Sequence, residues 1–367
     1  MGGLARLQQM GIVVAATCLV ILSALWLIAR SATIVEQAFS RGFFPWIVSA
    51  QGVLFGWLPF SLAEAVVLMV PPAVCGLLLW WIVVRGRGAT DLQIGALVWL
   101  IVSAGLVTVA TGYLFWGLNY SRPPLRERLG WEIDSPDAAL LASASNALIE
   151  ILNEEHGKGG GERPWAELGA SWKHLDQAVN DGIRRASHVL GQSWDPPSGA
   201  AKPIALSRGM SYLGISGIYF PWTGEANVNV DVPQIQLPHV TAHEKAHQLG
   251  LAAEDEANFV AFVACFNSPD PRLRYSAALF AFQQVAARFP RQRKTTSPWE
   301  SLSSGVREDL YRIRDYWQAF DGPVERVAAR VNDRYLRSQG VREGIQSYSE
   351  SVNLILSYWK RVEMAEE

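Results

Sequence analysis

The chain has 367 residues, 50% of them hydrophobic and 18% charged, with 32 Lys and Arg against 34 Asp and Glu and a net charge of −2. This balance excludes an intrinsically disordered chain, and the lack of any basic block or stripe argues against a nucleic-acid partner. The three cysteines, Cys18, Cys75 and Cys265, each lie in an apolar run, so the sequence contains neither a disulfide framework nor a cysteine-rich metal site.

Three uncharged apolar runs lie in the N-terminal third of the sequence, over residues 11–29, 65–84 and 94–118. Each approaches or exceeds the roughly 20 residues that a helix needs to cross the hydrocarbon core of a bilayer. The sequence therefore predicts a membrane region over residues 1–120 with three transmembrane helices and the lipid bilayer as its partner. The first run is expected to remain as an anchor, because no A-x-A cleavage site follows it.

A fourth uncharged run, residues 42–62, is predicted to be an interfacial or re-entrant segment. Only Ala63 and Glu64 separate it from the next run, which is too short a connection between two spanning helices. Prolines also interrupt it, which is typical of segments that do not span. Within the second span, Pro71 and Pro72 are expected to introduce a kink.

The basic residues around the spans favour a cytoplasmic N-terminus. Arg85 and Arg87 lie in the loop between the second and third spans, and positive charge accumulates in cytoplasmic loops. Three spans then place everything after Leu118 outside the cytoplasm. The chain is therefore expected to be a multi-pass membrane protein whose second domain lies outside the cytoplasm.

Residues 121–367 carry more charge and show helical periodicity. One helix is predicted to begin at a cap over residues 135–137 and to end before the glycine-rich loop 157–161, and another to cover 165–190. The alternation of polar and apolar residues over 226–232 predicts a strand. Helical patterns then return up to the C-terminus. The fold class is therefore mostly α, with one small β-sheet in the second domain.

His243, Glu244 and His247 form the pattern HExxH. On a helix the two histidines lie one turn apart on the same face, so both imidazoles can bind one Zn²⁺. Glu244, next to the first histidine, can take a proton from the water that such a metal activates. A purely structural metal site needs no base, so Glu244 favours a catalytic site.

Carboxylates that follow this motif are candidates for a third metal ligand. A straight helix would place Glu254 about 10 Å along its axis from His247, outside coordination range. Gly250 lies between them and can end the first helix, so that a second helix turns back. Either Glu254 or Glu256 then becomes the third ligand, and the spacing alone leaves both open.

The sequence strongly resembles the bacterial family called domain of unknown function 3810. The resemblance lies in TGEANVNVD and PHVTAHEKAHQLGLAAEDEANFVAFVACFNS, in WGLNYSRPPL at the end of the third span, and in NDRYLRSQGVREGIQSYSESVNLIL near the C-terminus. It covers nearly the whole chain. Members of this family are predicted zinc peptidases anchored in the bacterial inner membrane. The resemblance implies a zincin-like domain, one Zn²⁺ per chain and a peptide or protein substrate.

Among zincins, Glu254-x-x-Ala257-Asn258 is similar to the E-x-x-A-D/N signature of gluzincins, in which the first Glu binds zinc. This resemblance implies Glu254 as the third ligand. It places Asn258 where an Asp usually orients a metal-binding histidine, a role that a neutral amide can also fill. The metzincin spacing would put the third ligand at Ala253, which cannot bind a metal.

Other polar residues are candidates for contacts with the substrate or the transition state. A tyrosine hydroxyl can donate a hydrogen bond to a tetrahedral oxyanion, and the predicted strand can hold an extended peptide at its edge. The candidates are Tyr212, Tyr219, Tyr335 and Tyr348, together with Glu225, Asn227 and Asn229 around the predicted strand.

The sequence thus predicts a membrane-anchored zinc-dependent peptidase with Glu244 as its general base. The alternative is a membrane-bound zinc sensor or scaffold with a structural metal site and no hydrolytic activity, in which a protein side chain fills the fourth coordination position. A transporter or channel is disfavoured, because no acidic or basic residue lies within the apolar runs.

Overall fold

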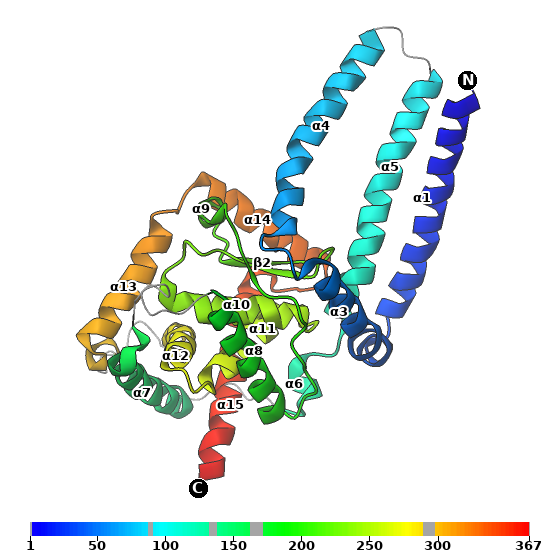
Figure 1. Ribbon diagram of the computed structural model, residues 1–367. Coiled ribbons are helices and arrows are strands. Elements are labelled where there is room, and N and C mark those ends of the chain that lie inside the picture. The colour runs from blue at the N-terminus through cyan, green and yellow to red at the C-terminus, as the bar shows by residue number, and fades with distance from the viewer. Residues whose placement is uncertain (1, 87–90, 132–137, 162–171, 289–297, 367) are drawn as a thin grey trace.

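The computed structural model describes residues 2–86, 91–131, 138–161, 172–288 and 298–366. It is mostly helical, and three long apolar helices project from one end of a helical domain (Figure 1). The predicted helix cap at 135–137 and the beginning of the helix predicted over 165–190 lie outside the described residues.

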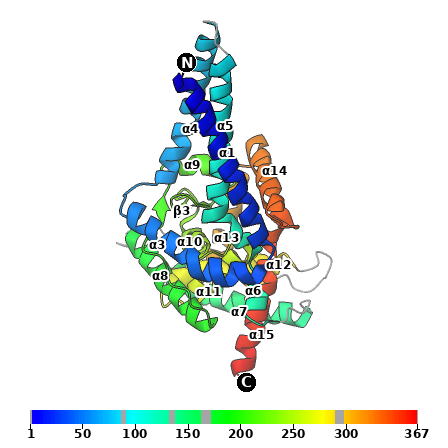
Figure 2. The same ribbon diagram turned by 90° about the vertical axis from the view of Figure 1, so that its right-hand side faces the viewer.

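Three helices are long and apolar enough to cross a membrane, as the sequence predicts. They are α1 (Gly2–Ala29), α4 (Leu62–Gly86) and α5 (Asp91–Phe115). α1 and α5 pack side by side, and the Ser103 hydroxyl on α5 donates to the carbonyl of Gly11 on α1 at 2.8 Å (Figures 1 and 2). α4 lies apart from this pair in Figure 1, and none of its most apolar stretch is buried in the protein.

Two details of the spans concern their course and their bounds. α4 runs through Pro71 and Pro72 as one helix, so the prolines remove backbone donors without ending it, and the kink expected there stays a prediction. α5 ends at Phe115 rather than at residue 118, because Trp116 has a φ of −151°. The chain then continues as the 3₁₀ helix η2 (Gly117–Ser121).

The chain between α1 and α4 folds against the domain at the ends of the spans. It contains α2 (Ala32–Ile34), the π-helix η1 (Val35–Phe43) and α3 (Phe44–Phe55). α3 is not one of the candidate spans. Its Gln51 amide donates to the carbonyl of Pro221 at 2.7 Å, whereas other side chains of α3 are exposed. An interfacial position for this segment stays a prediction.

The remaining helices build the domain around α11, whose residues 257 to 265 are all buried. That stretch is apolar on nearly all sides, as expected for a helix enclosed by others. α8, α10, α12 and α15 pack around it. These helices are α6 (Leu125–Arg128), α7 (Ala138–Glu155), η3 (His156–Gly160), α8 (Trp172–Val189), α9 (Ser207–Tyr212), η5 (Gln234–Gln236), α10 (Leu237–Gln248), α11 (Glu254–Phe266), α12 (Pro271–Ala286), η6 (Pro298–Ser301), α13 (Ser304–Gln318), α14 (Pro323–Ser338), η7 (Gly344–Ser349) and α15 (Ser351–Glu366).

A small sheet packs against α10. Its strands are β1 (Lys202–Pro203), β2 (Gly217–Phe220) and β3 (Glu225–Val228). Their order is β1-β3-β2, with β1 parallel and β2 antiparallel to β3. The strand predicted over 226–232 is shorter than expected, because the side-chain oxygen of Asn229 accepts the N–H of Asp231 at 3.0 Å and turns the chain.

Hydrogen bonds join the sheet to the start of span α4. The Ser61 hydroxyl caps α4 by accepting the N–H of Glu64 at 2.9 Å, and it bonds Asn227 on β3 at 2.7 Å. The carboxylate of Glu225 accepts the N–H groups of the first two residues of α4 at 3.0 and 2.8 Å. We call Ser61, Glu64, Glu225 and Asn227 the polar junction.

Candidate metal centre

Helix α10 presents His243 and His247 on one face, as the motif predicts. Their Nε2 atoms lie 3.1 Å apart. α10 ends at Gln248, and Gly250 follows with a φ of +78°, which glycine adopts without a steric penalty. The chain turns there, so that α11 starts at Glu254 and packs back against α10.

Glu254 joins the two histidines. Its Oε2 lies 3.2 Å from the Nε2 of His243 and 3.6 Å from the Nε2 of His247. Among the described residues these three form a group able to hold a metal ion, with ligand atoms within 4.8 Å of one another. Two atoms bound at about 2.0–2.1 Å to one tetrahedral metal lie roughly 3.3 Å apart. The three observed separations fit a single ion.

The ring orientation of His247 is fixed from outside the group. Its Nδ1 donates to the carbonyl of Leu251 at 2.6 Å, which leaves the lone pair of a neutral ring on Nε2, facing the group. Burial lowers the pKa of His247, but the charge and hydrogen bond of Glu254, together with Glu244 and the Leu251 carbonyl, raise this pKa to about 9. Conversely, burial raises the pKa of Glu254, but both histidines lower it well below its usual range. A metal binds such a site by displacing the proton.

Glu244 lies beside this group and is buried, with 3% of its surface exposed. Its Oε2 has no hydrogen-bond partner in the described part of the chain. Burial raises the pKa of this carboxyl to about 7. Gly217 at the start of β2 packs directly against it, since a Cβ there would come within 2.4 Å of the Glu244 Oε1. A side chain at position 217 would displace the carboxylate.

Glu256, the alternative third ligand, points elsewhere. Its carboxylate accepts the N–H of Leu125 at 2.5 Å and pairs with the Arg128 guanidinium at 2.7 Å. Residues two apart on a helix are rotated by about 200°, so Glu254 and Glu256 cannot face the same group. The structure brings Glu254 to the histidines and Glu256 to Arg128.

Asn258 lies one turn after Glu254 on α11 and is 6% exposed. Its backbone carbonyl is 3.4 Å from the Nε2 of His239. The His239 ring stacks on Phe280 with centroids 3.8 Å apart, and His239 is not in the metal-holding group. Burial, with a contribution from the nearby His243, lowers the pKa of His239 to about 3.

The polar candidates on the sheet are engaged within the protein. Asn227 and Asn229 are 0% exposed, and Glu225 is 3% exposed. Glu225 and Asn227 belong to the polar junction, whereas the Asn229 amide donates to the Ser211 hydroxyl and to the carbonyl of Ile215. The polar atoms expected to line a cleft thus make structural hydrogen bonds.

Two of the candidate tyrosines lie near the metal-holding group. The ring of Tyr219 is 6.5 Å from that of His247, and its buried hydroxyl has no hydrogen-bond partner among the described residues. The ring of Tyr335 is 6.2 Å from that of Tyr120. Burial raises the pKa of both Tyr120 and Tyr335, and the negative charge of Glu254 raises them further.

The structure does not place the other two candidate tyrosines at the metal-holding group. Tyr212 packs edge-on against Phe320 at 4.9 Å and lies outside the metal-holding group. Tyr348 belongs to η7, and its side chain lies outside the described residues.

The segment after α5 contains residues that the motif analysis missed. The ring of Trp116, one residue after the end of α5, lies 5.7 Å from that of His247. Arg122 donates to the carbonyl of Gly250 at 2.7 Å and so holds the turn between α10 and α11. Tyr120 lies beside Trp116, with ring centroids 6.2 Å apart, so the two rings form one wall of the site. The only signal in the sequence was that WGLNYSRPPL carried part of the family resemblance.

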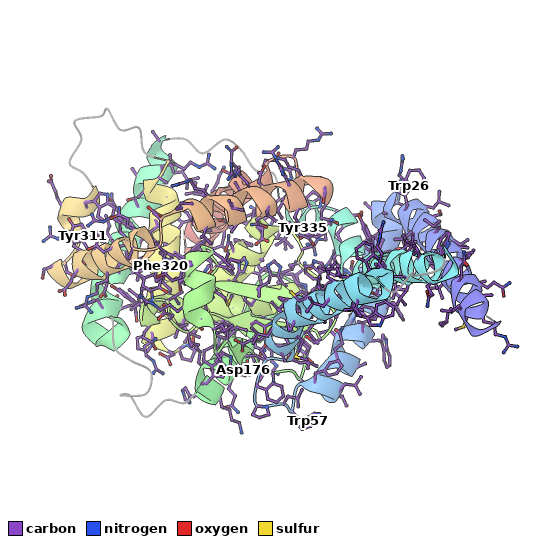
Figure 3. All side chains as sticks on the ribbon, turned by 90° about the horizontal axis from the view of Figure 1, so that it is seen from above. Trp26, Trp57, Asp176, Tyr311, Phe320 and Tyr335 are labelled. Carbon is purple, nitrogen blue, oxygen red and sulfur yellow. The ribbon has the colours of Figure 1, made fainter. Side chains whose placement is uncertain are left out.

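Lys245, in the middle of the motif, projects from the opposite side of α10 to the histidines. It is 0% exposed, and its ammonium lies 3.1 Å from a carboxylate oxygen of Asp176 on α8 and 3.1 Å from the carbonyl of Gly199. The same Asp176 oxygen accepts the N–H of Ala201 at 2.9 Å. Figure 3 labels Asp176. α10 is thus held from behind by a buried ion pair.

Fold and site together define a mostly helical protein with three candidate membrane spans and a group of side chains able to hold a metal ion. The chain belongs to the family described as "Protein of unknown function (DUF3810)", whose family model matches residues 39–356. The family resemblance is thereby confirmed. No curated protein and no solved structure matches the chain.

Proposed function

We propose that this protein is a membrane-anchored, zinc-dependent peptidase with a gluzincin-like site. The observation that carries the proposal is the convergence of His243, His247 and Glu254, with the buried carboxylate of Glu244 beside them. Two imidazoles and one carboxylate are a known ligand set of catalytic zinc. The group has three members among the described residues, which favours an open fourth position over the filled one of a structural site.

Bound at these residues, Zn²⁺ would polarise a carbonyl and lower the pKa of a water molecule. Glu244 would accept the proton of the attacking water and then deliver it to the leaving amine nitrogen. Gly217 keeps that carboxylate in place without crowding it. Tyr120 and Tyr335, on the Glu254 side, are candidates to hydrogen-bond the tetrahedral oxyanion.

The proposed substrate is a peptide or protein in extended conformation. β2 is an edge strand that pairs with β3 alone among the described strands. Its first residue, Gly217, contacts Glu244. A peptide that adds to the free edge of β2 would therefore run past the general base, with its backbone held by main-chain hydrogen bonds.

The three candidate spans would anchor the enzyme in the bacterial inner membrane. Arg85, in the last turn of α4, and Arg87, which follows α4 in the sequence, favour a cytoplasmic position for this connection and hence an extracytoplasmic domain.

The test is to measure zinc content and cleavage of a peptide library with the full-length protein. We expect Glu244→Gln to retain zinc and to lose turnover by roughly 10²–10⁴-fold, the usual contribution of a general base. Glu254→Ala should lose zinc, whereas Asp255→Asn, a change of the neighbouring carboxyl, should keep it. Glu308→Gln, at an exposed carboxylate on α13, is the control for both measurements.

Equal turnover by wild type and Glu244→Gln would remove Glu244 from the mechanism. Full zinc content in Glu254→Ala would show that the third ligand is wrong. A wild-type protein that holds zinc but cleaves no peptide would support the sensor or scaffold with a structural site.

A further inference from the structure

Helix α14 presents an apolar stripe to its surroundings. Leu336 is the one residue of this helix that is buried. Val324, Val327 and Val331 are 55%, 51% and 61% exposed. Their spacing of three and four residues puts them on one side of the helix. Such a run of valines is unfavourable in water and indicates a surface that something covers.

A second stripe on the exposed surface of α14 is basic. Its members recur every three or four residues beside the valines: Arg326, Arg330, Arg334 and Arg337. Glu325 and Asp333 are the acidic residues of the helix, so four arginines against two acids leave a charge of +2. An exposed helix with adjacent apolar and arginine-rich stripes is typical of helices that lie on a membrane surface.

The C-terminal end of α14 lies near the end of α5, and its N-terminal end lies near α9. Towards its C-terminal end, the ring of Tyr335 is 6.2 Å from that of Tyr120, which belongs to η2 immediately after α5. Towards its N-terminal end, the Glu325 side chain lies against Gly214, just beyond α9. Figures 1 and 2 show α14 at the end of the domain from which the spans project, and Figure 3 labels Tyr335 on this helix.

The residues that flank α9 extend the same surface. Leu206 and Leu213 are 52% and 41% exposed. The N–H of Leu206 donates to the carboxylate of Glu64, in the first turn of α4, at 2.7 Å. Leu206 therefore lies at the level where α4 meets the domain. We call Leu206, Leu213, Val324, Val327 and Val331, with the four arginines of α14, the membrane-facing surface.

We propose that the membrane-facing surface lies on the bilayer that holds the spans and binds anionic lipid headgroups. The apolar side chains would enter the headgroup region, and Arg326, Arg330 and Arg334 would pair with lipid phosphates, whereas Arg337 is paired with Asp333 at 2.8 Å. Charge complementarity and continuity with the spans identify the occupant as an anionic bilayer rather than another protein. Because α14 also carries Tyr335, lipid contact would steady one wall of the metal centre. The proposal does not depend on peptidase activity.

The test uses the full-length protein in lipid nanodiscs, with an environment-sensitive fluorophore on a cysteine introduced as Val327→Cys. Cys75→Ser removes the exposed native cysteine, whereas Cys18 and Cys265 are buried. In discs with anionic lipid we expect a blue-shifted emission and quenching by lipids spin-labelled near the headgroup. Tyr311→Cys, at a position 49% exposed on α13, is the matched control and should show neither change.

The contribution of charge is tested in the labelled Val327→Cys protein. Replacing Arg326 and Arg330 with Gln should reduce quenching in anionic discs to the level seen with zwitterionic lipid. Replacing Arg312 and Arg314 on α13 with Gln should have no effect. An unquenched label at position 327, which would instead fit a protein partner, overturns the proposal. Equal quenching at position 311, or no effect of the first arginine pair, also overturns it.

Discussion

The candidate spans α4 and α5 join the domain in different ways. α4 begins at the polar junction, where a few directed hydrogen bonds hold its first turn to β3. α5 ends in an aromatic cluster, in which the Trp116 ring lies 4.6 Å from Tyr219 and 6.0 Å from Phe44. We call Phe44, Trp116, Tyr120 and Tyr219 the aromatic junction.

The difference between the junctions concerns both free energy and proximity to the metal. Each hydrogen bond fixes direction but contributes only about 0.5–1.5 kcal/mol net, or about 1.5–3 kcal/mol when one partner is charged. A buried tryptophan contributes more, through many weak contacts. In the described part of the chain, the aromatic junction adjoins the metal-holding group, because the rings of Trp116 and Tyr219 lie 5.7 and 6.5 Å from that of His247. A substitution in the aromatic junction should therefore weaken metal binding, whereas a substitution in the polar junction should not.

The largest effect is expected from Trp116→Ala. Loss of this buried ring should lower the free energy of unfolding by about 3–5 kcal/mol and also weaken zinc retention, because His247 loses a wall. Thermal unfolding in detergent and zinc content after dialysis measure the two effects. Trp26→Ala, at a ring 57% exposed on α1, is the control and should leave both almost unchanged. Similar losses in the two variants would break the comparison.

An intermediate effect is expected from Glu225→Gln. The uncharged amide of Gln has only one oxygen, so it cannot accept the two N–H groups of α4 as the carboxylate does. The variant should lose about 1–3 kcal/mol of stability while its zinc content stays the same. Glu64→Gln is a matched control, because Glu64 also accepts two backbone N–H groups, those of Ala205 and Leu206, but in a more exposed position. Its loss should be smaller. Zinc loss in Glu225→Gln would show that the two junctions are not independent.

The smallest effect is expected from Ser61→Ala, which removes the cap of α4. Loss of a helix cap costs about 0.5–2 kcal/mol. Ser31→Ala removes a longer cap bond of 3.4 Å at an exposed site and should cost less. Unfolding curves of both variants, recorded in the same detergent, decide the order. A larger loss in Ser31→Ala would contradict the importance of the polar junction.

The sequence was sufficient to predict the features that depend on local patterns. Length and apolarity identified the three candidate spans, and helical spacing placed His243 and His247 together. Helical spacing alone could not choose between Glu254 and Glu256 as the third ligand, because both follow the glycine turn. Only the resemblance to the gluzincin signature favoured Glu254. In the structure the two side chains point in different directions from α11, and Glu256 forms an ion pair with Arg128.

Contacts between distant parts of the chain were not predictable in this way. Trp116 reaches His247 across more than a hundred residues, and no periodicity connects the two. The alternation of Asn227 and Asn229 suggested a strand with a polar face. In the structure both amides are buried, because hydrogen bonds from other elements satisfy them. Burial of polar side chains depends on such partners, which a local pattern does not contain.

The buried pair of Lys245 and Asp176 has a thermodynamic consequence for metal binding. A site whose ligands are disordered must use part of the metal's binding free energy to order them. Here α10 is held to α8 through Asp176, from the side opposite the histidines, before any ion arrives. The rotation of the helix, and with it the direction of both imidazoles, is set by the folding of the apo protein. The entropy cost of arranging the ligands thus falls on folding, and the affinity for the ion is correspondingly less reduced.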